Sequence, residues 1–103
     1  MLDDVHTPGF VDVEVTQSLR GLLRGGKINL DVAERGRGEL AQLRVRRHPD
    51  VRLLQRAWEL RGACTIYDGL YVALAEALDA TLLTRDGPLA RGIAGLVPVV
   101  TSE

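Results

Sequence analysis

Two aspartates at the edges of apolar segments are the residues of this chain that most clearly indicate chemistry. Asp68 stands just before the apolar run Val72–Leu78, and Asp86 follows the short apolar stretch Leu82–Thr84. A carboxylate beside buried chain is costly unless a cation or several hydrogen-bond donors compensate it. Two such carboxylates brought together repel each other, so a shared divalent metal ion is the natural reason to keep both.

The elements that must position these acids follow from the hydrophobic pattern, which predicts helices alternating with short strands. Strands separated by helices indicate one α/β domain over residues 1–103, with a parallel β-sheet flanked by helices on both faces. The predicted strands lie near 5–6 and at 43–47, 81–84 and 97–100. The predicted helices span 10–24, 30–43 with Asn29 as its cap, 51–60, 66–78 and 88–94.

The predicted topology allows the two aspartates to meet. Parallel α/β sheets bind ligands beyond the carboxyl ends of their strands. Asp86 directly follows a predicted strand, and Asp68 lies in the first turn of a predicted helix. Glu14 is a third candidate, because it lies at the margin of an apolar helical stripe, one turn after Phe10, and could lean over the same end of the sheet.

Each acid also has a purely structural explanation. Thr65 and Asp68 have the spacing of a capping box, in which the threonine caps the helix and the acid answers three residues later. Asp86 is followed by Gly87 and Pro88, so it could form a turn and cap the next helix. A lone glutamate such as Glu14 is most often a surface residue. None of these explanations accounts for all three acids at element junctions.

Composition narrows the class of protein. The chain has 103 residues and a formal net charge of −1, as expected for a globular domain. No apolar run reaches the roughly 18 residues that span a bilayer, and the first residues lack the features of a secretory signal. A single cysteine, Cys64, excludes an intramolecular disulfide and a cysteine-built zinc site. We therefore expect a cytoplasmic protein with no membrane contact.

Charge is segregated along the chain. Residues 20–62 carry eleven cations and five acids, a net charge of +6, whereas residues 1–19 carry −4 and residues 63–103 carry −3. Cations that hold phosphates beside carboxylates that hold a metal ion are what a nuclease requires. Solvated helix faces would give the same distribution.

The remaining residues with possible chemistry have simpler interpretations. We predict that Trp58 and Phe10 lie in the core rather than serve as stacking platforms. His6 and His48 have no histidine partner at helical spacing, so a histidine-built metal site is not expected. Cys64 has no nearby base and is predicted to be a small buried apolar group.

Three segments of the chain resemble a known family. The segments HTPGFVDVEVTQSLR at 6–20, YDGLYVALAEA at 67–77 and LTRDGPLA at 83–90 are similar to the second, third and fourth conserved blocks of VapC-type PIN-domain ribonucleases. The resemblance implies a magnesium-dependent endoribonuclease toxin of a type II toxin–antitoxin (VapBC-like) system. Such a toxin is silenced by a small antitoxin and is usually a homodimer. The resemblance assigns Glu14, Asp68 and Asp86 to the catalytic and metal-binding centre, which would hold Mg²⁺ or Mn²⁺, with Thr84 as a supporting hydroxyl.

One block of that family has no match in this chain. The family begins with an apolar strand that ends in aspartate and continues into a helix, whereas only Met1 and Leu2 precede Asp3 and Asp4. We therefore expect a PIN-like sheet that lacks its first strand and helix. A late start codon, a shortened chain or a decayed gene would each explain the missing block. In this form the protein is expected to bind metal weakly and cleave RNA poorly.

Three other functions fit parts of the pattern. A phosphoacceptor domain of the response-regulator type also has acids and a threonine at strand ends, but it needs a late lysine, and the only lysine is Lys27. A catalytically impaired or dead PIN-like domain could act mainly as an antitoxin-binding protein. The third alternative is a nuclease on the same scaffold that acts on DNA.

Overall fold

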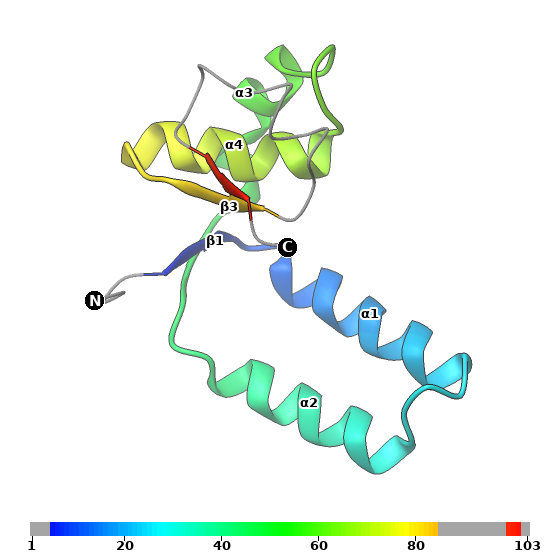
Figure 1. Cartoon of the computed structure of the whole chain (residues 1–103). Coiled ribbons are helices and arrows are strands. Elements are labelled where there is room, and N and C mark those ends of the chain that lie inside the picture. Colours follow the sequence, from blue (N-terminus) through cyan, green and yellow to red (C-terminus); the bar gives the residue numbers. More distant parts are fainter. Residues whose placement is uncertain (1–4, 85–98, 102–103) are drawn as a thin grey trace. The chain divides into compact units, whose positions relative to one another are not determined.

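The computed structural model describes residues 5–84 and 99–101, and it shows four α-helices among them (Figure 1). The chain divides into two compact units, Met1–Arg47 and His48–Glu103, which are described separately. Within the described residues the strands form two two-stranded sheets, β1 with β2 and β3 with β4. The predicted α/β class is confirmed, and the prediction that residues 1–103 form one domain stays a prediction.

The first unit is a helical hairpin with a short strand pair at its base. It contains β1 (His6–Pro8), α1 (Val11–Arg24), α2 (Leu30–Gln42) and most of β2 (Arg46–His48). The Arg46 backbone N–H donates to the Val5 carbonyl over 2.8 Å. The strand predicted at 43–47 lies later in the chain, because Leu43 ends α2 in an extended conformation before β2 begins.

The turn between α1 and α2 explains why the first helix stops. Gly26 has a φ of 71°, the left-handed conformation that glycine adopts without strain. Its N–H donates to the Leu23 carbonyl over 3.2 Å, and the Lys27 N–H donates to the Leu22 carbonyl over 2.9 Å. These two bonds form a Schellman motif, which satisfies carbonyls at the end of the helix.

The start of α2 and its contact with α1 are both set by particular residues. The Asn29 side chain accepts from the Val32 N–H over 2.9 Å, so the predicted cap is confirmed. Gly36 faces Leu19 of α1, where an added Cβ would lie 3.2 Å from a leucine methyl group. Gly36 has a low intrinsic preference for helix, but its lack of a side chain lets α2 approach α1 closely.

The second unit packs two helices beside a parallel strand pair. Its elements are the 3-10 turn η1 (Asp50–Arg52), α3 (Leu54–Glu59), α4 (Ile66–Leu78), β3 (Leu82–Thr84) and β4 (Val99–Thr101). The helix predicted at 51–60 is split, because its first turn is wound as a tighter 3-10 turn. Strands β3 and β4 are parallel, as predicted, with Leu83 opposite Val100. The helix predicted at 88–94 lies outside the described residues.

The core of the second unit lies between α4 and β3. Its buried residues are Leu60, Val72, Ala75 and Leu82, with Cys64 and Tyr71 packed against them. Val72 is fully buried. No helix in the described part of the chain is long and apolar enough to cross a bilayer.

The contact between α3 and α4 is close because of one glycine. A Cβ added at Gly69 would lie 3.1 Å from both the Cα and the Cβ of Ala57, and 3.3 Å from its carbonyl oxygen. Arg56 also joins the two helices, since its Nε and Nη2 donate to the Glu76 carboxylate over 2.7 and 2.9 Å. Gly69 thus lets the start of α4 approach Ala57, and Arg56 joins α3 to the last turn of α4.

Candidate functional site

Asp68 lies where the sequence predicted it, in the first turn of α4. Thr65 caps this helix, and its hydroxyl oxygen accepts from the Asp68 N–H over 3.1 Å. Only the threonine half of the predicted capping box is formed, because among the described residues no hydrogen bond or ion pair engages the Asp68 carboxylate. The cap therefore accounts for the backbone of Asp68, and its acid group lies in the first turn of α4, where the helix dipole favours a negative charge.

The surroundings of Asp68 are largely apolar. The residue is half-buried, and most of the helix that follows it is buried: Gly69, Leu70, Val72, Ala73, Leu74 and Ala75. Its carboxylate oxygens are hard ligands of the kind that divalent cations such as Mg²⁺ prefer. Asp68 thus meets the chemical requirement for a metal ligand.

Cys64 is the titratable neighbour of Asp68. Burial, and then the negative charge of Asp68, raise the pKa of the Cys64 thiol. The Sγ atom lies 3.9 Å from the Leu60 carbonyl oxygen and packs against the core. The sulfur is therefore a neutral, half-buried group, in agreement with its prediction as a small apolar residue and not as a nucleophile.

Glu14 lies in the first turn of α1 and is exposed. Its N–H donates to the Phe10 carbonyl over 3.0 Å, and its own carbonyl accepts from the Ser18 hydroxyl over 3.1 Å. Glu14 belongs to the first unit and Asp68 to the second. That the two carboxylates share one cation stays a prediction.

The third acid, Asp86, lies outside the described residues. The strand predicted to precede it is present, since β3 ends at Thr84, whose backbone pairs in register with Thr101 of β4. In residues 5–84 and 99–101 no group of three His, Cys, Asp or Glu side chains could hold a metal ion. Because Asp86 lies outside the described residues, the predicted centre of Glu14, Asp68 and Asp86 stays a prediction.

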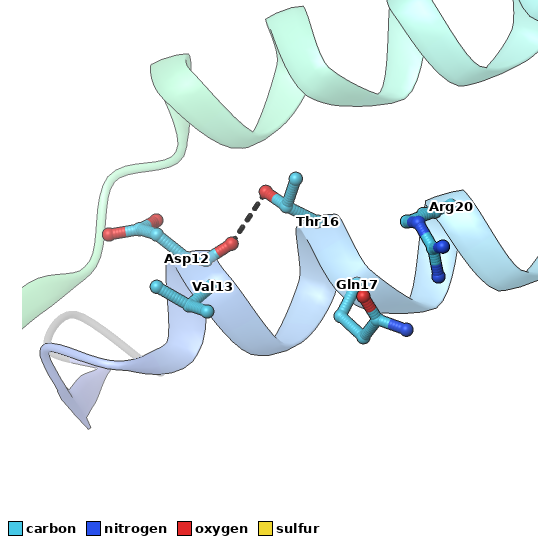
Figure 2. A pocket seen from close by; sticks show the side chains of 5 residues that line it. All are labelled: Asp12, Val13, Thr16, Gln17 and Arg20. Carbon is cyan, nitrogen blue, oxygen red and sulfur yellow. Dashed lines mark hydrogen bonds between the residues drawn. The ribbon is translucent and has the colours of Figure 1, made fainter.

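A hollow on α1 is a feature that the sequence did not indicate. It has a volume of about 370 Å³ and is lined by Asp12, Val13, Thr16, Gln17 and Arg20 (Figure 2). The Thr16 hydroxyl donates to the Asp12 carbonyl over 2.6 Å. The Asp12 carboxylate accepts from Arg47 Nε over 2.7 Å. Because Arg47 neutralises this acid, the cation of Arg20 dominates the charge of the hollow.

The cations of residues 20–62 divide into two groups. Arg37, Arg47 and Arg56 are held by carboxylates. Others have no ion pair among the described residues, and they remain available for an anionic ligand: Arg20, Arg24, Lys27, Arg35, Arg44, Arg52 and Arg61. Part of the predicted phosphate-binding charge is therefore neutralised by ion pairs within the chain, some of them on the surface, and part is not paired among the described residues.

The prediction that Trp58 lies in the core is wrong. Its surface is 57% exposed, and the Arg61 guanidinium carbon lies 4.6 Å from the centre of its ring. The buried side of this segment is formed by Leu53, Ala57 and Leu60, at helical spacing. Trp58 follows Ala57 by one residue, about 100° around the helix, and so points away from the core. That spacing is the signal that would have placed it correctly.

Comparison with known proteins adds a family and named relatives. The family model described as PIN domain matches residues 1–92. The chain is 39% identical over 82 residues to ribonuclease VapC9 and 41% identical over 86 residues to ribonuclease VapC1, both of Mycobacterium tuberculosis strain H37Rv. These alignments cover 80% and 82% of this chain, and 65% of each relative. The chain therefore spans slightly less than two thirds of their length. Ribonuclease VapC12 of Mycobacterium tuberculosis strain CDC 1551 is 39% identical over 89 residues, covering 86% of this chain and 69% of the relative.

Proposed function

The chain belongs to the PIN-domain family, and from this premise we propose that it is a VapC-type endoribonuclease. In this proposal it is the toxin of a type II toxin–antitoxin pair and hydrolyses phosphodiester bonds of RNA. The names of the relatives support the substrate, since each is called a ribonuclease.

One observation carries the proposal. Asp68 stands half-buried at the start of an apolar helix, and the helix cap uses its N–H while leaving its carboxylate outside the cap. A half-buried carboxylate outside the cap can serve as a metal ligand, and the match of the chain to the PIN-domain family supports that role. Thr65 holds the residue in place independently of that function.

The donor chemistry of the proposed centre fits a hard divalent cation. Carboxylate oxygens of Asp68, Glu14 and Asp86 would hold Mg²⁺, with Mn²⁺ as the alternative. When bound, the ion supplies electrostatic stabilisation of the phosphate charge and lowers the pKa of water. The residues of the chain do the remaining work: the acids position the ion, and unpaired cations such as Arg20 and Arg52 hold backbone phosphates.

The proposed partners are a small antitoxin of the VapB type and a second copy of the chain. Several large apolar side chains of the first unit support a protein partner, because they are strongly exposed: Val13 at 71%, Leu30 at 60% and Leu43 at 52%. Burying such groups is the main driving force of protein association. Co-purification with an antitoxin, followed by measurement of the mass of the complex, tests both partners.

Asp68→Asn is the variant that tests the function. The substitution keeps the side-chain size and the backbone N–H that binds Thr65, so the fold should be retained. Asp79→Asn is a matched control, because it removes an acid from the other end of α4, where Asp79 has a φ of 51° that asparagine tolerates. Cleavage of labelled RNA and of DNA is measured with and without Mg²⁺.

The expected result is slow, metal-dependent cleavage of RNA by the wild-type chain and by Asp79→Asn, and a loss of at least about a hundredfold in Asp68→Asn. Cleavage of DNA instead would support the DNA-directed alternative. If the wild-type chain binds an antitoxin but cuts no nucleic acid, the alternative of an impaired, antitoxin-binding domain replaces the proposal. Full activity in Asp68→Asn would remove Asp68 from the centre.

A further inference from the structure

The exposed face of α3 is a surface that the proposed centre does not use. Val51, Leu54 and Trp58 are 73%, 44% and 57% exposed, and their spacing of three and four residues places them along one side of η1 and α3. Arg61 follows Trp58 by three residues and covers one part of its ring. We define these four residues as the Trp58 surface. Apolar side chains that lie together on one exposed face indicate an interaction site.

Charge indicates what kind of ligand the Trp58 surface takes. Arg61 is exposed and donates only to the Trp58 carbonyl oxygen, over 3.0 Å, while Arg52 has no ion pair among the described residues. The nearest acid along the helix, Glu59, is held by Gln55 and Arg56 over 3.2 Å each. Asp50 adds one acid at the η1 end, whereas the end at Trp58 is apolar and is cationic through Arg61. A second copy of the chain placed face to face would bring like charges together, which disfavours self-association.

The backbone at Trp58 lies close to the backbone at Asp68 within the second unit. Ala57 and Gly69 are in contact, and each is the chain neighbour of one residue of interest. Because consecutive Cα atoms are about 3.8 Å apart, the Cα atoms of Trp58 and Asp68 are separated by roughly 12 Å at most. The turn after α3 strengthens this link, since the Leu60 carbonyl accepts from the Cys64 N–H over 3.1 Å and Cys64 senses the charge of Asp68.

We propose that Trp58 is a stacking platform for a base of single-stranded RNA, with Arg61 and Arg52 neutralising the adjoining phosphates. A base stacked on an aromatic ring gains binding energy whatever its identity, and a guanidinium beside the ring adds a cationic contribution. The proximity to Asp68 allows one strand to touch the platform and the proposed catalytic acid. Trp58 thus positions the substrate. The inference rests on the proposed function for its substrate class, but it concerns binding and not cleavage.

Tryptophan fluorescence reports directly on the contact between Trp58 and RNA, because Trp58 is the only tryptophan of the chain. Its fluorescence is measured in the full-length Asp68→Asn chain without divalent ions, so that no cleavage occurs. The probes are single-stranded oligonucleotides of RNA, and abasic strands of equal length and charge. Stacking predicts that the RNA quenches Trp58 and that the abasic strand binds with little quenching. It also predicts that the RNA binds at least about fivefold more tightly than the abasic strand.

Variants test the same contact without the fluorophore. Trp58→Ala should weaken RNA binding at least about fivefold, and Trp58→Phe should restore most of it, because phenylalanine also stacks. Leu22→Ala is a matched control, since Leu22 is 43% exposed in the first unit and far from α3 in the sequence. It should leave RNA affinity unchanged. Circular dichroism of each variant verifies that the helices are intact.

The contrary outcomes distinguish failure of the platform from failure of the proposed nuclease. RNA that binds without quenching Trp58 removes the platform and leaves the proposed nuclease intact. RNA that quenches Trp58 but is not cut by the wild-type chain with Mg²⁺ removes the nuclease and leaves the platform. Quenching that depends on protein concentration alone identifies a second copy as the occupant. Quenching by an acidic peptide, with none by RNA, identifies a protein partner.

Discussion

Gly69→Ala should destabilise the protein, although alanine is the better helix former. In the interior of an exposed helix this exchange stabilises by up to about 1 kcal/mol. At position 69 the new methyl carbon would lie 3.1 Å from the Cα and Cβ of Ala57 and 3.3 Å from its carbonyl oxygen. Two of these atoms belong to the backbone of α3, so a side-chain rotation cannot relieve the contact.

The expected size follows from these two opposing contributions. Forcing an extra carbon into a packed contact costs about 1–3 kcal/mol, so after the gain in helix propensity the net loss is about 1 kcal/mol. In a domain of this size such a loss lowers the melting temperature by about 4–8 °C. Urea unfolding followed by circular dichroism and by Trp58 fluorescence measures it. The fluorescence reports on the contact itself, because Trp58 is the neighbour of Ala57.

Gly21→Ala is the matched control. Gly21 also lies inside a helix, α1, but a Cβ there would meet nothing within 4 Å. This variant should be as stable as the wild type or more stable, so the two glycine variants should differ by the full cost of overpacking. Adding Ala57→Gly to Gly69→Ala should recover part of the loss, a coupling that independent sites do not show. If Gly69→Ala unfolds at no lower urea concentration than Gly21→Ala, the close contact between α3 and α4 is refuted.

Two further predictions concern contacts of α4. Thr65→Ala removes the hydroxyl that accepts from the Asp68 N–H and should cost about 1 kcal/mol, whereas Thr65→Ser should cost little; equal urea midpoints for both would disprove the cap. Hydrogen bonds from Arg56 lower the pKa of Glu76. The ion pair therefore stabilises the folded state at pH values above the ordinary pKa of a glutamate, and this stabilisation is lost as the pH falls through the lowered pKa. Glu76→Gln should therefore unfold earlier than the wild type at pH 7 and show a smaller difference at pH 3, and a difference that grows on acidification would contradict this account.

Local features of the fold were readable from the sequence. The helices at 11–24 and 66–78 follow from hydrophobic spacing, and the caps at Asn29 and Thr65 from side chains that accept backbone N–H groups. Each of these signals acts over a few residues. The packing of the folded chain agrees with these local signals, because packing and capping favour the same first and last residues of each helix.

Non-local features were harder to predict. The residue type of Trp58 predicts a core position. In the structure Leu53, Ala57 and Leu60 form the buried side of α3, and Trp58 lies on another side of the helix. Asp68 was identified through its position, but sequence alone could not separate its N–H, which serves the cap, from its carboxylate. The meeting of Glu14, Asp68 and Asp86 depends on contacts between distant segments, which no local pattern encodes.

The environment of Cys64 has a practical consequence for handling the protein in air. Oxidation and alkylation proceed through the thiolate, and burial together with the charge of Asp68 suppresses that form. We expect the lone sulfur to resist disulfide cross-linking between chains during storage without a reducing agent. A reaction with iodoacetamide at pH 7.5 as fast as that of free cysteine would show that this protection is absent.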